Sequence, residues 1–127
     1  MRLVLGEGCV VLIRAIQPEQ SSTTVTVMTK HRQAKRKSNK KLKVKDLCSG
    51  PSKLTQAFKI DKNTFNQTHV CDSNDLWLEE GQTISDDNIV QCPRIGIDYA
   101  QEWKSKPLRF YVRANENVSV RDKTAEN

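Results

Sequence analysis

The chain has 127 residues, and its 21 lysine and arginine residues outnumber its 15 aspartate and glutamate residues by six. This length leaves room for one domain. Hydrophobic residues make up 36% and the mean hydropathy is −0.65, so its core is expected to be modest. The longest apolar run, Cys9–Ile13, is far shorter than the roughly 20 residues that a transmembrane helix needs. Four cysteines are too few for a disulfide-rich miniprotein, so free thiols are expected.

The first predicted element is a buried strand over residues 9–16, because this octet is nearly all apolar and rich in β-branched residues. A buried strand needs neighbours on both sides. Either the rest of the chain supplies both, or the chain is the rear part of a larger domain. Residues 17–22 form a polar exit, and residues 23–29 are compatible with either a strand or a helix.

Charge is distributed unevenly along the chain. Residues 30–45 contain nine lysine or arginine residues and no acid, whereas residues 63–93 contain six acidic residues and no lysine or arginine. The basic segment 30–45 is expected to form a loop or arm. It is typical of a solvated loop, of a nuclear address (Lys35–Lys37 with Lys40–Lys41), or of an arm that contacts phosphates, and these alternatives are compatible. The acidic segment is expected to be a solvated outer loop.

The clearest local signal predicts a short helix over residues 51–58. Pro51 suits the first helical position, Gly50 or Ser49 the cap, and Leu54, Ala57 and Phe58 have helical spacing. Lys53 falls in the first turn, where a cation opposes the helix dipole. That placement makes sense if an anion binds there to free backbone N–H groups and to Lys53.

Later elements are predicted as strands at residues 75–79, 94–97, 107–113 and 117–120, with the last two paired. Gly96 would allow a close backbone approach within its strand. The chain contains none of the common phosphate-binding, serine-hydrolase or zinc-protease motifs, and the spacing of His69 and Cys71 is weak for zinc. The residues alone therefore indicate a basic, nucleic-acid-binding α+β protein without a recognisable reaction.

Two longer blocks carry a family resemblance. Residues 47–54 (Leu-Cys-Ser-Gly-Pro-Ser-Lys-Leu), and Glu102-Trp103 followed by residues 106–113 (Lys-Pro-Leu-Arg-Phe-Tyr-Val-Arg), resemble the alkyladenine (3-methyladenine) DNA glycosylases of the animal type. Residues 10–15, 76–79 and 94–97 agree with that family in order and spacing. The similarity covers nearly the whole chain.

The resemblance implies a function and a fold. Members of this family remove alkylated and deaminated purines from duplex DNA, by flipping the nucleotide out of the stack for hydrolysis by a water. We therefore expect an α+β fold, a single mixed domain with a curved antiparallel sheet and surrounding helices. We also expect no metal or other cofactor, damaged double-stranded DNA as partner, no membrane association, a monomer, and a nuclear location.

The resemblance also implies roles for individual residues. Arg14 would help to hold the attacking water at the end of the buried strand, and the backbone carbonyl of Ile95 would contact the same water. The alternative for Arg14 is a structural ion pair at the edge of the core. Gly96 would lie at the DNA surface, and the alternative for it is only a bulge. The residues expected to contact the DNA backbone are Arg32, Gly50, Ser52, Lys53 and Lys62.

One part of the family pattern has no counterpart. The catalytic glutamate, in a Glu-Thr-Glu-Ala-Tyr stretch, and the aromatic residues that stack on the flipped base do not occur in residues 1–14, and Glu7 does not match. Residues 1–127 are therefore expected to be the C-terminal portion of one glycosylase-like domain, incomplete on its N-terminal side. The alternative is a non-catalytic basic fragment that binds duplex DNA.

Overall fold

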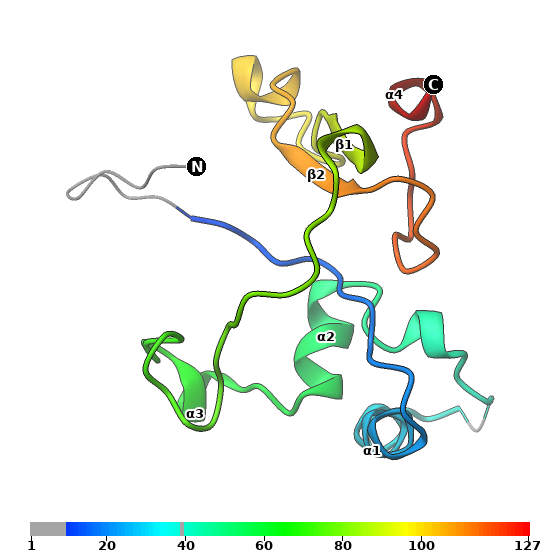
Figure 1. Cartoon of the computed structure of the whole chain (residues 1–127), viewed down its shortest axis with the longest axis vertical. Coiled ribbons are helices and arrows are strands. Elements are labelled where there is room, and N and C mark those ends of the chain that lie inside the picture. The colour runs from blue at the N-terminus through cyan, green and yellow to red at the C-terminus, as the bar shows by residue number, and fades with distance from the viewer. Residues whose placement is uncertain (1–9, 39) are drawn as a thin grey trace. The chain divides into compact units, whose positions relative to one another are not determined.

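The computed structural model describes residues 10–38 and 40–127 (Figure 1). It is of the expected α+β class. The chain divides into two compact units, residues 1–59 and 60–127, which are described separately. Whether they form one domain stays a prediction. Among the described residues, no helix is long and apolar enough to cross a membrane. The elements are α1 (Ser22–Gln33), α2 (Pro51–Ala57), α3 (Lys62–Phe65), α4 (Lys123–Glu126), β1 (Ile89–Cys92) and β2 (Arg109–Val112).

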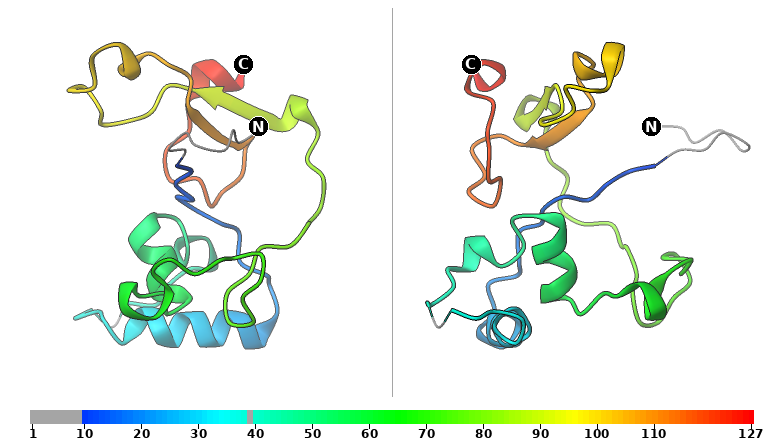
Figure 2. Two further views of the ribbon diagram at one scale, coloured as in Figure 1. Left: turned by 90° about the vertical axis from the view of Figure 1, so that its left-hand side faces the viewer. Right: turned by 180° about the vertical axis from the view of Figure 1, so that it is seen from behind.

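The first unit is built on α1 and α2, which lie side by side (Figure 2). The Ser21 side chain caps α1 by accepting a hydrogen bond from the Thr24 backbone N–H at 3.2 Å, which resolves the ambiguous segment 23–29 as helix. The predicted helix at 51–58 is confirmed as α2, with Gly50 as its cap and Phe58 after its last residue. The buried core between these helices consists of Met28, Leu47, Cys48 and Ala57.

The strand predicted at residues 9–16 is wrong for the part that the structure describes; Cys9 lies outside it. Residues 10–16 are irregular, and Val10 is 92% and Ile13 47% exposed. The backbone N–H of Ile16 bonds the carbonyl of Cys48 at 3.4 Å. An apolar extended segment becomes a strand only where another strand pairs with it, and among the described residues the single ladder joins β1 to β2.

In the second unit, β1 and β2 pair antiparallel, with Val90 opposite Tyr111. The strand predicted at 107–113 is confirmed over Arg109–Val112, but its partner is β1, which the sequence did not indicate. The strand predicted at 117–120 is wrong. There the chain turns instead, because the side chain of Asn115 accepts hydrogen bonds from the backbone and the side-chain amide of Asn117 at 2.9 and 3.0 Å.

Two further strand predictions are also wrong. Residues 75–79 are irregular, with Trp77 55% and Leu78 64% exposed. Residues 94–97 form no strand: β1 ends before them, at Cys92, and Pro93 has no backbone N–H with which to extend the ladder. Gly96 lies in the bend that follows, with a φ of +70° and open space where a side chain would project. The glycine therefore serves a left-handed conformation rather than a close backbone approach.

The C-terminal segment is tied to β2 by two side chains. The Tyr111 hydroxyl accepts a hydrogen bond from the Asp122 backbone N–H at 2.8 Å, and Asp122 in turn caps α4. Arg109 donates to the carbonyl of Val120 and to Cys92 Sγ, with its guanidinium 4.6 Å from the Tyr111 ring centre. The position of α4 therefore depends on Arg109 and Tyr111, which belong to residues 106–113 of the second block that carries the family resemblance.

We predict that Tyr111→Phe lowers the free energy of unfolding by about 1 kcal/mol, because the partly buried Asp122 N–H loses its acceptor. Denaturant unfolding measures the change, and hydrogen exchange should rise first in residues 122–126. Tyr99→Phe is the control, since Tyr99 is 83% exposed. Equal effects of the two substitutions would show that the Tyr111 hydroxyl does not hold this segment.

Candidate nucleic-acid interface

The start of α2 combines backbone donors with a cation. Gly50 caps the helix in an extended conformation, with a φ of 175°, that any residue can adopt. Its carbonyl accepts the first helical bond, from the Leu54 N–H at 2.8 Å. The N–H groups of Ser52 and Lys53 belong to the first turn and have no acceptor within the helix. That turn contains no acidic residue, so the positive end of the helix is not compensated there.

The Lys53 side chain folds back over this start. Its ammonium donates a hydrogen bond to Ser49 Oγ at 3.0 Å, and Ser49 is 7% exposed. An ammonium has three donors, so a bond to Ser49 leaves others for a further acceptor. Gly50, Ser52 and Lys53 thus lie at the helix start that the sequence predicted, and Ser49 joins them through its bond to Lys53, which the sequence did not indicate. Their contact with DNA stays a prediction.

Arg32 does not lie among the exposed cations. It is 7% exposed, and its Nη1 donates to Gln56 Oε1 at 2.6 Å. Burial, followed by the nearby charge of Arg36, lowers the pKa of the Arg32 guanidinium, which nevertheless stays charged at neutral pH. In this arrangement Arg32 joins α1 to α2. A direct contact of Arg32 with a phosphate stays a prediction, and it would require this side chain to leave Gln56.

The rest of the basic segment is largely accessible. Lys30–Gln33 complete α1, residues 34–43 are irregular where described, and a short 3-10 turn follows at Val44–Asp46. Of the nine cations, Arg32 is buried and Arg36 half-buried, whereas seven are exposed: Lys30, Lys35, Lys37, Lys40, Lys41, Lys43 and Lys45. This distribution is what a polyanion-binding surface requires, because exposed cations can approach phosphates without desolvating a core.

The other expected site residues lie in different places. Arg14 is exposed among residues 10–16, which are irregular, so within the described part of the chain it does not lie on the buried strand that was predicted to carry it. Lys62 is exposed at the first position of α3, which the Asp61 carboxylate caps. Ile95, 54% exposed, and Gly96 lie in the bend after β1. Neither the water-holding role of Arg14 nor that of the Ile95 carbonyl is tested by these positions.

The second family block carries exposed ring and charge contacts. The ammonium of Lys106 lies 3.7 Å from the centre of the Trp103 ring. Lys104 pairs with Asp98 at 2.6 Å, and this hydrogen bond and charge lower the pKa of the Asp98 carboxyl. Both contacts are exposed, so they contribute little to stability.

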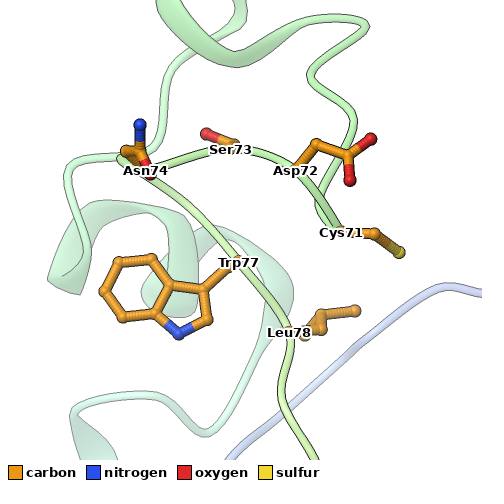
Figure 3. Close-up of a pocket in the computed structure, with 6 residues that line it drawn as sticks. All are labelled: Cys71, Asp72, Ser73, Asn74, Trp77 and Leu78. Atoms are coloured by element: carbon orange, nitrogen blue, oxygen red, sulfur yellow. The ribbon is translucent and has the colours of Figure 1, made fainter.

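A separate open hollow of about 360 Å³ lies on the loop between α3 and β1 (Figure 3). It is lined by Cys71, Asp72, Ser73, Asn74, Trp77 and Leu78. None of the expected site residues contributes to it. The part of the chain that the structure describes holds no cluster of three side chains suited to a metal ion.

Comparison with known proteins places these features in a family. The family profile described as methylpurine-DNA glycosylase matches residues 4–116. The chain belongs to the methylpurine-DNA glycosylase family. Both blocks that carried the resemblance, residues 47–54 and 102–113, lie within the matched range, so the family prediction is confirmed.

Individual relatives agree with this family assignment. A mouse DNA-3-methyladenine glycosylase is 45% identical over 125 residues, which is 95% of this chain and 36% of the mouse protein. The human DNA-3-methyladenine glycosylase is 43% identical over 124 residues, covering 95% and 40%. A probable DNA-3-methyladenine glycosylase of Encephalitozoon cuniculi is 38% identical over 112 residues, covering 88% and 50%. The chain thus spans well under half the length of these two mammalian relatives.

Proposed function

We propose that this chain belongs to a base-excision-repair enzyme, a DNA glycosylase that hydrolytically removes alkylated or deaminated purines from duplex DNA. The observation that carries the proposal is the family match over residues 4–116, together with relatives named DNA-3-methyladenine glycosylase. Lys35–Lys37 with Lys40–Lys41 support a nuclear location, and we propose that the protein acts as a monomer.

The proposed reaction divides into binding and chemistry. Cations on the surface hold the duplex through its phosphates, and the damaged nucleotide leaves the stack because its glycosidic bond is unreachable inside it. Arg14 and the Ile95 carbonyl then orient the attacking water. A positioned general base contributes about 10²–10⁴ in rate, and these 127 residues contain no counterpart of the glutamate that supplies it in the family.

A second function is a binding module without turnover. The seven exposed cations within residues 30–45 favour it, because they attract duplex DNA with or without a reaction. Both functions predict DNA binding, and only the first predicts base release. The decisive experiment measures release of 3-methyladenine and hypoxanthine from duplex DNA.

For DNA binding, we predict an affinity that does not depend on sequence and falls steeply with salt. Each phosphate contact contributes about −0.9 to the slope of log K against log salt concentration. Lys53→Ala should weaken binding to all sequences alike and make the slope shallower by about one. The matched control is Lys123→Ala, which removes an exposed charge from α4, outside the expected contacts. A salt-insensitive affinity, or a change of base preference in Lys53→Ala, would contradict the interface at α2.

For base release, we predict that the 127-residue chain alone is silent or very weak, because it lacks the glutamate and the stacking aromatics. Single-turnover release from alkylated duplex is measured for this chain and for a full-length enzyme of the family that contains it. Turnover by the chain comparable to that of the longer protein would refute the need for further residues. Absence of release from both would favour the binding module.

For Arg14, we predict that Arg14→Ala in the longer protein reduces single-turnover base release by about tenfold or more, since a slightly misplaced nucleophile can cost about 10² in rate. The melting temperature and the DNA affinity should stay nearly unchanged. A sharp fall in melting temperature with normal cleavage by the folded fraction would instead make Arg14 a structural residue.

A further inference from the structure

Three polar side chains form a hydrogen-bonded series between α1 and the start of α2. Arg32 Nη1 donates to Gln56 Oε1 at 2.6 Å, and Gln56 Nε2 donates to Ser52 Oγ at 3.2 Å. Along this series the side chains change from buried Arg32, through half-buried Gln56, to exposed Ser52. Next to it, His31 Nδ1 lies 2.8 Å from the carbonyl of Ala57, a second contact that holds α1 against the end of α2.

The chemistry of these groups sets the direction of every hydrogen bond in the series. An arginine can only donate, so the Gln56 side chain must present its oxygen to Arg32. Its NH₂ group then necessarily faces Ser52 and donates to the hydroxyl oxygen. Because Ser52 Oγ accepts at this point, its own proton is free to point elsewhere. The buried charge of Arg32 thereby selects the donor orientation of an exposed hydroxyl.

The burial of Arg32 is costly, which makes a purely structural explanation incomplete. Its Nε is buried and has no hydrogen-bond partner within the described part of the chain. An apolar side chain of similar length would avoid that cost. What an apolar residue cannot do is orient the Gln56 amide.

We propose that Arg32 and Gln56 are positioning residues that hold the Ser52 hydroxyl as an outward donor to a phosphate oxygen of the DNA backbone. This inference rests on the proposed function, and it gives Arg32 an indirect role in place of the direct DNA contact expected from the resemblance. Ser52 makes the contact. Arg32 acts from within the core, and Gln56 transmits the orientation.

The test is a double-mutant cycle on duplex-DNA affinity with the full chain, using Ser52→Ala and Gln56→Leu. Each single substitution should weaken binding about tenfold, the size of one hydrogen bond to a charged acceptor. In the Ser52→Ala background, Gln56→Leu should change affinity less than about twofold. Because no charge is removed, the salt slope should stay unchanged, in contrast to Lys53→Ala. Additive effects of the two substitutions would overturn the proposal.

Gln56→Glu provides a second, sharper variant. The introduced carboxylate keeps the pairing with Arg32, so folding is preserved, but it offers only acceptors and draws the Ser52 proton inward. The effect of its added negative charge on DNA affinity is measured separately by making the same substitution in the Ser52→Ala background. We expect a larger loss of affinity with Ser52 present than with it absent. Equal losses would mean that the charge alone acts and that Ser52 is not oriented.

Arg32 itself is tested by a conservative pair. Arg32→Lys retains a donor for Gln56 and should keep most of the affinity, whereas Arg32→Met should weaken binding as Gln56→Leu does. Melting temperatures of both variants separate a loss of folded protein from a loss of binding. If the unaltered chain does not bind duplex DNA, the proposed function fails. If it binds and Arg32→Met binds equally well, only the positioning role fails.

Discussion

The packing of α2 against α1, with the guanidinium of Arg32 buried between them, is the constraint on which the rest of the first unit depends. Arg32 reaches Gln56 across 24 positions of sequence, and His31 reaches the Ala57 carbonyl across 26. Together with the core of Met28, Leu47, Cys48 and Ala57, these contacts fix α2 relative to α1. Burial raises the pKa of the Cys48 thiol, with the charge of Arg32 acting in the opposite direction, so Cys48 stays a neutral core group. Everything proposed for the start of α2 presupposes this packing.

The fold follows from sequence only where its causes are local. The helix α2 was predictable, because Pro51, the cap at Gly50 and the spacing of Leu54 and Ala57 all lie within eight residues. Strands failed for the opposite reason. Residues 10–16 and 75–79 have strand composition, but pairing depends on distant partners, and the described chain supplies none to them. Even β2, correctly expected, pairs with the unforeseen four-residue β1.

The candidate site shows the same division. Lys53 at the start of α2 could be anticipated, since an uncompensated cation in a first turn is a local anomaly. The roles of Ser49 and Gln56 could not be anticipated, because they depend on hydrogen bonds that only the folded structure shows. Ser49 accepts from Lys53, and Gln56 accepts from Arg32 and donates to Ser52. Arg32, counted in the sequence as one of nine basic residues, is removed from the surface by folding. The proposed glycosylase chemistry rests on family membership, because no described side chain indicates that reaction by itself.

A crystal structure of the chain bound to a short duplex would test most directly whether the start of α2 contacts DNA while Arg32 stays buried. We predict that Ser52 and Lys53 contact the phosphates of one strand while Arg32 remains on Gln56, buried between α1 and α2. A complex in which Arg32 has left Gln56 to bind a phosphate would contradict it. So would one in which the start of α2 faces away from the DNA.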